Sequence, residues 1–188
     1  DSTQYFEAFY QCKQTPDSGF ILIGVTDKTD ADGDIWLVKT DKDGNFEWEK
    51  TYGGAGVEYG FYVNICYDKG YIIGAEIIDI PSDNIDWWII KTDSTGQIEW
   101  QKTFGGLYED LGTVVKQTKD GGYITGGGYS LYENPVDFYM SKPRIIKLDA
   151  LGNVEWDKMY VQEKYAAHIL IIHELPDGSF ITAGQTTL

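Results

Sequence analysis

Four aspartates stand close together between two runs of apolar residues, and they could bind a cation. They are Asp27, Asp30, Asp32 and Asp34, with Gly33 among them. Calcium takes roughly six to eight oxygen ligands, which clustered carboxylates supply. The spacing is not that of an EF-hand loop, because the glycine is misplaced and no Glu stands at the twelfth position. The cluster therefore predicts either a Ca²⁺ site or an exposed acidic turn.

Three further carboxylates occupy equivalent positions in a repeated pattern, each where a predicted strand begins. They are Glu7, Glu58 and Asp110. If these strands line a central channel, the three side chains form an acidic collar at its mouth, which would hold a cation or a basic side chain. The alternative is that each is simply a solvated residue at the start of its strand.

The two histidines of the chain lie in one predicted strand, at His168 and His173, followed by Glu174. Positions five apart in a regular strand face opposite sides, so we expect no shared metal ion. The sequence also contains no HExxH pattern, phosphate-binding glycine loop, dinucleotide fingerprint or identifiable nucleophile with its base. Nothing in it positively indicates catalysis.

Aromatic side chains gather in the longest predicted loop and beside it. They are Tyr129, Tyr132, Phe138 and Tyr139, with Met140 next to them. Exposed aromatics on a variable loop suit stacking on a sugar or docking a protein partner. They would equally suit the covering of an open sheet edge, and the sequence leaves both possibilities open.

Two interleaved patterns organise the chain. The first reads DIWLVKTDKDGNFEWEKTYGG from Asp34, DWWIIKTDSTGQIEWQKTFGG from Asp86, and in degraded form PRIIKLDALGNVEWDKMY from Pro143. The second occurs four times, as DSGFILIG, DKGYIIGA, DGGYITGG and DGSFITAG. Trp48, Trp100 and Trp156 recur at intervals of 52 and 56 residues. A period of about 50 residues is typical of a repeat architecture.

Each repeat reads as four short antiparallel strands, because runs of β-branched and aromatic residues alternate with Gly, Asp, Asn and Pro turns. Such a unit cannot bury both of its faces alone, which is typical of a β-propeller blade. We predict an all-β chain of about 3.5 four-stranded blades and about 14 strands, with almost no helix. The predicted blades span 5–54, 55–106 and 107–161, and a half blade spans 162–188.

The links between predicted strands fall into two classes. Those from strand 1 to 2 and from strand 3 to 4 are short Asp and Gly turns, such as Asp41 to Gly44. Those from strand 2 to 3 vary in length and sequence, and binding residues commonly lie on such loops. We therefore expect any ligand on the face that carries the variable links.

Recurring charged residues predict a structural ion pair across each hairpin. Pairing Asp41 with Asn45 would place each Lys opposite a Glu, and an apolar residue opposite each Trp. The Trp is then a residue that packs between blades. The predicted ion pairs are Lys39–Glu47, Lys91–Glu99 and Lys147–Glu155, and the apolar partners of the three Trp residues are Val38, Ile90 and Ile146.

Composition narrows the choice of partners and compartment. Thirty acidic residues against 15 basic ones give a formal charge of −15, which disfavours nucleic acid and anionic membranes. No apolar run approaches the ~20 residues that a membrane-spanning helix needs, so we expect no membrane insertion. The two cysteines, Cys12 and Cys66, stand at non-equivalent repeat positions, so we expect two buried thiols rather than a disulfide.

The repeats resemble those of secreted and cell-surface β-propeller proteins of archaea and bacteria, through the DGGYI, DxWxxKTDxxG and WxKTYGG patterns. The resemblance implies an extracellular propeller, commonly part of a large multidomain protein, and supplies no catalytic residues. The third repeat departs from the pattern, because Arg144 stands where Trp36 and Trp88 stand, and Val161 and Gln162 replace the Gly pair.

The function predicted from the sequence is a non-catalytic module for protein interaction, adhesion or structural assembly at the cell surface or outside the cell. Its partners would be other proteins or further blades of the same polypeptide. The alternatives are a lectin-like glycan binder that uses the long aromatic loop, and the propeller scaffold of a polysaccharide-acting or quinoprotein-like enzyme. No cofactor is expected apart from Ca²⁺.

Overall fold

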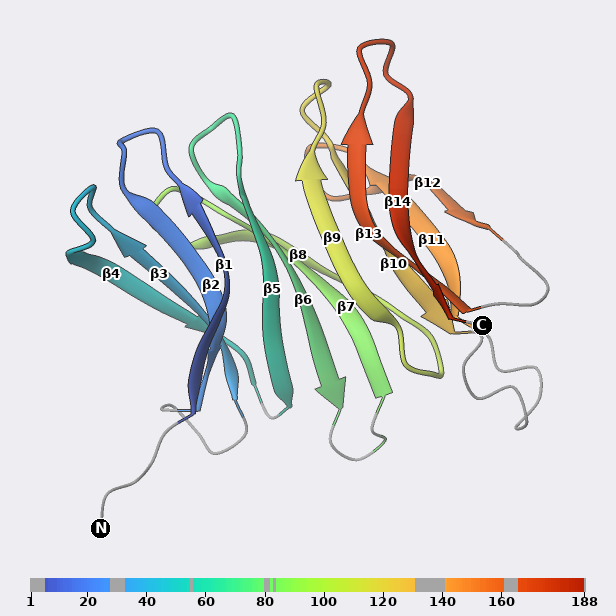
Figure 1. Ribbon diagram of the computed structural model, residues 1–188, viewed down its shortest axis with the longest axis horizontal. Coiled ribbons are helices and arrows are strands. Elements are labelled where there is room, and N and C mark those ends of the chain that lie inside the picture. The colour runs from blue at the N-terminus through green and yellow to red at the C-terminus, as the bar shows by residue number, and fades with distance from the viewer. Residues whose placement is uncertain are drawn as a thin grey trace.

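The computed structural model describes residues 6–27, 33–54, 56–79, 82, 84–130, 141–160 and 166–187. In these residues the chain forms fourteen antiparallel strands in four sheets and no helix (Figure 1). The all-β class and the strand grouping predicted from the sequence are therefore confirmed.

Each sheet consists of consecutive strands paired in chain order. The first sheet contains β1 (Glu7–Gln14), β2 (Phe20–Thr26), β3 (Asp34–Thr40) and β4 (Phe46–Tyr52). The second contains β5 (Val57–Ile65), β6 (Tyr71–Asp79), β7 (Asn84–Thr92) and β8 (Ile98–Phe104). The third contains β9 (Leu111–Gln117), β10 (Tyr123–Ser130), β11 (Ser141–Leu148) and β12 (Val154–Met159), and the fourth contains β13 (Ala166–Glu174) and β14 (Phe180–Thr187).

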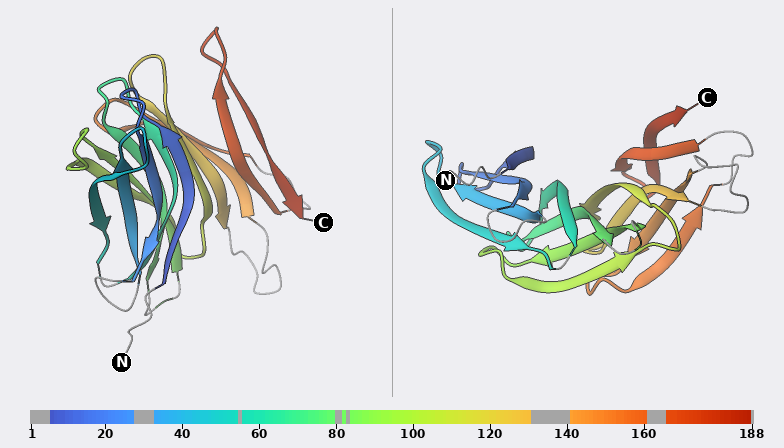
Figure 2. Two further views of the ribbon diagram at one scale, coloured as in Figure 1. Left: turned by 60° about the vertical axis from the view of Figure 1, so that its left-hand side comes forward. Right: turned by 90° about the horizontal axis from the view of Figure 1, so that it is seen from below.

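The four sheets follow one another along an arc (Figure 2). Their first strands are neighbours, since β1 contacts β5, β5 contacts β9 and β9 contacts β13. These strands lie on the concave side of the arc, whereas β4 and β8 lie on its convex side. The described residues form an open arc and no closed ring.

Apolar side chains fill the space between successive sheets. Ile21, Ile73 and Ile90 belong to the cluster between the first and second sheets, and Trp87 and Ile146 to that between the second and third. The recurring Trp residues pack across the same interfaces: the Trp100 ring lies 5.2 Å from that of Tyr123 between centroids, and Trp156 lies 6.1 Å from Phe180. Their predicted role in packing between units is confirmed.

The register of the hairpin between the third and fourth strands differs from the prediction by one residue. The backbone amide of Asp41 does donate to the carbonyl of Asn45, at 2.9 Å. A β-bulge follows, so Lys39 lies opposite Trp48 and Val38 lies opposite Glu49. The same shift places Trp100 opposite Lys91 and Trp156 opposite Lys147. The predicted pairing of Val38, Ile90 and Ile146 with the three Trp residues is therefore wrong.

Candidate functional site

The recurring lysines are the centres of buried ionic networks. Lys91 is 2% exposed, and its Nζ lies 2.6 Å from Glu99 Oε2, 2.7 Å from Asp68 Oδ2 and 2.8 Å from the Thr92 carbonyl oxygen. Lys39 and Lys147 make the equivalent contacts. The predicted Lys–Glu pairs are thus confirmed. Each lysine also pairs with a second carboxylate, from the turn before the second strand, which the sequence analysis did not predict. These second carboxylates belong to Asp17, Asp68 and Asp120.

These networks keep their members charged. Burial alone would lower the pKa of Lys91, but its hydrogen bonds to Asp68 and Glu99 outweigh burial and raise that pKa. Hydrogen bonds from Thr118 and Lys147 lower the pKa of Asp120 to about 2. Each network joins the turn before the second strand to the third and fourth strands of its sheet, so the recurring Asp, Lys and Glu residues have a structural role.

The networks predict a loss of stability in acid. The folded-state pKa of Asp120 lies below its unfolded value, so its contribution is complete above about pH 4 and is lost as the pH falls toward 2. Because the Asp120 side chain is 59% exposed, screening reduces this contribution to about 1 kcal/mol. Urea unfolding at pH 5, 3 and 2 should show this loss, and Asp120→Asn should make the decline shallower. An unchanged acid dependence in that variant would contradict the assignment.

The Gly-Gly pairs make room for carboxylates at two junctions between sheets. A Cβ atom on Gly53 would collide with Asp34 Oδ1, and one on Gly105 would collide with Asp86 Oδ1. At the first junction Glu58 Oε2 also lies 2.6 Å from such a Cβ and accepts a bond from Gly54 N at 3.4 Å. In each sheet, the glycine allows the carboxylate near the start of the third strand to approach the backbone that follows the fourth strand.

Asp110, at the second of these junctions, is fully buried. Its Oδ1 accepts a hydrogen bond from the backbone amide of Ser130 at 2.8 Å, and its Oδ2 has no hydrogen-bond partner in the described structure. Burial is the main reason why the pKa of Asp110 rises to about 7, and the negative charge of Asp86 adds to the rise. A carboxylate in this setting is poised to accept a proton or a cation.

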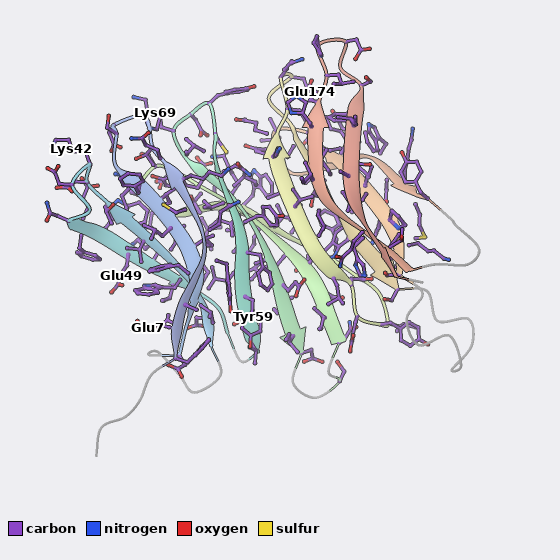
Figure 3. All side chains as sticks on the ribbon, viewed as in Figure 1. Glu7, Lys42, Glu49, Tyr59, Lys69 and Glu174 are labelled. Carbon is purple, nitrogen blue, oxygen red and sulfur yellow. The ribbon has the colours of Figure 1, made fainter. Side chains whose placement is uncertain are left out.

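The three carboxylates of the predicted acidic collar differ in their exposure. Glu58 and Asp110 are buried between sheets, so the expectation that they are solvated is wrong for both. Glu7 is exposed at the lower end of β1 in Figure 3, the end at which Tyr59 also lies. Lys42, Lys69 and Glu174 mark the opposite end, as predicted for the short turns.

The predicted Ca²⁺ cluster is only partly described. Asp27 Oδ1 accepts a hydrogen bond from the Phe6 backbone amide at 2.6 Å, and Asp34 is buried against Gly53. Asp30 and Asp32 lie outside the described residues. In the part of the chain that is described, no group of three or more His, Cys, Asp or Glu side chains is arranged to hold a metal ion.

Of the predicted aromatic site, only Tyr129 lies in the described structure, and Tyr132, Phe138 and Tyr139 lie outside it. The ring of Tyr129 packs beneath the Arg144 guanidinium, whose central carbon lies 4.6 Å from the ring centroid. Arg144 also forms two hydrogen bonds to Asp157, of 2.7 and 3.1 Å. Tyr129 is therefore engaged in the third sheet.

A bulge between Ile169 and Ile171 shifts the alternation of β13. The two histidines nevertheless have different surroundings, because His168 lies against Gly128 and Ser141 of the third sheet, whereas His173 lies opposite the exposed Ile181. Their partners on β14 are Gln185 and Ile181, about 13 Å apart at ~3.3 Å per residue, so one metal ion still cannot bind both. His168 Nε2 lies 3.0 Å from Ser141 Oγ, a contact that sequence spacing could not reveal. Burial lowers the pKa of His168.

Both cysteines are free thiols, as predicted. Cys66 is buried, and burial raises its pKa to about 12, which makes the thiol unreactive. Cys12 is exposed, which corrects the expectation that both are buried.

The chain matches no known protein family and no curated protein. The described residues also include no helix that is long and apolar enough to cross a membrane. The arguments for function therefore come from the chain itself.

Proposed function

We propose that the chain is a non-catalytic β-propeller module of an extracellular or cell-surface protein, and that it acts in protein interaction and assembly through open faces of its first and fourth sheets, which a protein partner or further blades of the same polypeptide would cover. The repeated four-stranded units, their arrangement along an arc and the acidic net charge of −15 support this proposal.

One observation carries the proposal: a position that is buried in three sheets is exposed in the fourth. Ile21, Ile72 and Ile124 are 0%, 0% and 1% exposed, because in each case the next sheet along the chain covers the side chain. Ile181 is their equivalent on β14 and is 56% exposed. Ile171 on β13 is likewise 55% exposed. Exposed apolar side chains gathered on one sheet mark an interaction surface.

The first sheet has the complementary open face. Val63, Val115 and Ile172 are each fully buried against the preceding sheet. Cys12 is their equivalent on β1 and is exposed. The first and fourth sheets therefore each expose a face that is covered by a neighbouring sheet at the other positions in the chain. A head-to-tail contact between two copies would rebuild the interface that joins neighbouring sheets within the chain.

The fourth sheet also has an open edge. Among the described residues, β14 pairs only with β13. A cavity of about 580 Å³ lies between this sheet and β11 and β12, lined by Ile145, Trp156 and Phe180 among others. An unpaired strand edge beside a cavity with both apolar and polar lining residues favours the addition of a strand from a partner.

The fourth repeat limits which strand can be added. Ser179 stands where the other sheets have Gly19, Gly70 and Gly122, and a Cβ at those positions would collide with a carbonyl oxygen of the third strand. A strand that copies β3, β7 or β11 would therefore meet Ser179. We expect the partner strand to pair with the other end of β14, from Thr182 to Thr186, beside the cavity.

The test is self-association, measured by sedimentation velocity over a wide range of protein concentration. The chain should form oligomers as concentration rises, and Ile181→Asp should shift the population toward monomer. Ile98→Asp is the matched control, because Ile98 is 44% exposed but lies on β8 of the second sheet. A chain that stays monomeric and binds no hydrophobic dye would contradict the proposal.

A further inference from the structure

We propose that the junction between the second and third sheets binds one Ca²⁺ ion through Asp86, Asp110 and the side-chain oxygen of Asn84. The site goes beyond the proposed role in assembly and does not depend on it. It is separate from the aspartate cluster at Asp27 to Asp34.

The backbone of the junction brings two carboxylates close together. The backbone amide of Asp110 donates to the carbonyl oxygen of Ile85 at 2.6 Å, so Asp110 lies beside the part of β7 that carries Asn84 and Asp86. Asn84 Nδ2 binds Asp86 Oδ1 and the Gly106 carbonyl oxygen, each at 3.1 Å. Two like charges thus converge on a small region where burial makes their repulsion strong.

Two oxygen atoms in this region lack a hydrogen-bond donor. In the described structure, the buried atoms Asp110 Oδ2 and Asn84 Oδ1 have no hydrogen-bond partner. Asp110 is 0% exposed, so water from bulk solvent does not reach its carboxylate freely. The Asn84 amide is oriented by its two donated bonds, so its oxygen is a true acceptor. A cation would satisfy both oxygens at once.

Arg144, a cationic side chain that influences Asp110, forms its ion pair elsewhere. The charge of Arg144 acts on Asp110, but its guanidinium forms its ion pair with Asp157 at 2.7 Å and stacks on Tyr129. No described ion pair joins Arg144 to Asp110 or Asp86. The junction therefore retains negative charge after the contribution of Arg144.

The chemistry of these donors fits calcium. All of them are hard oxygens from carboxylate, amide and backbone carbonyl groups, which is the ligand set of Ca²⁺, whereas sulfur and imidazole donors are absent from this described cluster. With two carboxylates and one amide, the site differs from a cluster of three acidic, His or Cys ligands, which the described residues lack. Backbone carbonyls and water would complete the coordination shell.

The Asn84 and Asp86 side of the proposed site faces a cleft, whereas Asp110 does not line it. Asp86 and Asn84 also line a cleft of about 510 Å³ between the first and second sheets, together with Glu58 and Asp79. Asp79 is exposed, so the cleft opens to the surface. The negative charge of Asp79 adds to the effect of burial in raising the pKa of Asp86. The acidic walls would concentrate cations at the entrance.

The chain contains an internal comparison that supports a shared role for these residues. At the junction between the third and fourth sheets, Lys142 occupies the position equivalent to Asp86. Tyr129 and Ile77 are equivalent positions of the second strand, and they lie opposite Lys142 and Asp86 respectively. Ala167 replaces Asp110, and the Gly pair is also replaced. Both acidic residues and the glycines are thus replaced together, as expected if they act as one unit.

The test measures Ca²⁺ binding to the full chain after removal of metal with a chelator. Isothermal titration should show one Ca²⁺ per chain, and Ca²⁺ should raise the thermal midpoint. Asp110→Asn should abolish both effects, and Asn84→Ala should weaken binding by about tenfold or more. Asp43→Asn is the matched control, because it removes the same charge from an exposed residue paired only with Lys42, and it should bind as the unchanged chain does.

Three results would overturn the proposal. The first is the absence of both heat and a thermal shift in the unchanged chain, which would mean that water or a proton satisfies Asp110. The second is an equal shift with Mg²⁺, which demands stricter octahedral geometry, so charge screening alone would then explain the effect. The third is an unchanged response in folded Asp110→Asn, which would place the ion elsewhere. If Asp110→Asn fails to fold, unchanged Ca²⁺ binding in Asn84→Ala would overturn the proposal in its place.

Discussion

Replacing Lys91 by Ala should lower the free energy of unfolding by about 3 kcal/mol. The ammonium group is buried and bonds to Asp68, Glu99 and the Thr92 carbonyl oxygen, so its loss leaves that carbonyl without this donor and brings two carboxylates together unpaired. Both carboxylates are about half exposed and can be rehydrated, which keeps the cost below that of a fully buried pair. Urea denaturation at neutral pH measures the change.

Two further variants separate the causes of this loss. Lys91→Met removes the charge but keeps most of the buried hydrocarbon stem. The loss of stability in Lys91→Met therefore measures the ionic contribution, and the additional loss in Lys91→Ala measures packing. Lys42→Ala removes a lysine whose ion pair with Asp43 is exposed on both sides, and should change stability by less than about 0.5 kcal/mol. A loss in Lys91→Ala as small as that in Lys42→Ala would contradict the structural role of the network.

The strands were predictable from the sequence because their signals are local. Runs such as Ile21 to Val25 and Trp87 to Thr92 are bounded by Asp and Gly turns, and each turn closes through bonds within a few residues. The Lys–Glu pairs were predictable for the same reason, since each spans a single tight hairpin. Repetition strengthened every one of these signals.

The register of those hairpins was not predictable in the same way. The bulge that follows Lys39 has no distinctive residue, and it moves Trp48 to the position opposite that lysine. A similar bulge in β13 shifts the register between His168 and His173. A bulge changes the two-residue alternation on which facing arguments rest, and hydrogen bonding between strands decides where it occurs.

The candidate site was only partly visible in the sequence. Asp110 was identified by its repeat position, but charged residues are mostly exposed, and the expectation of a solvated side chain followed from that rule. Its burial depends on the packing of the second sheet against the third, which is a long-range property. The signal that could have indicated it is the Gly pair, because glycines without turn geometry often mark a close approach of other atoms.

Replacing Trp87 by Ala should be the most damaging single change in the core, with a loss of about 3 to 5 kcal/mol. Trp87 is 0% exposed in the cluster between the second and third sheets, and its ring packs against Gly127 of β10. Trp88, on the opposite face of β7, is only half-buried. Thermal and urea unfolding of Trp87→Ala and Trp88→Ala compare the two positions, and an equal loss would contradict the packing described.

Trp87→Phe tests the polar part of the same side chain. Among the described residues the buried Trp87 Nε1 has no hydrogen-bond partner, so removing this N–H relieves a cost that partly offsets the lost volume. We therefore expect Trp87→Phe to lose about 1 kcal/mol or less, far below Trp87→Ala. A loss close to that of Trp87→Ala would mean that an ordered water binds the indole nitrogen, and the junction between the second and third sheets would then be hydrated as well as acidic.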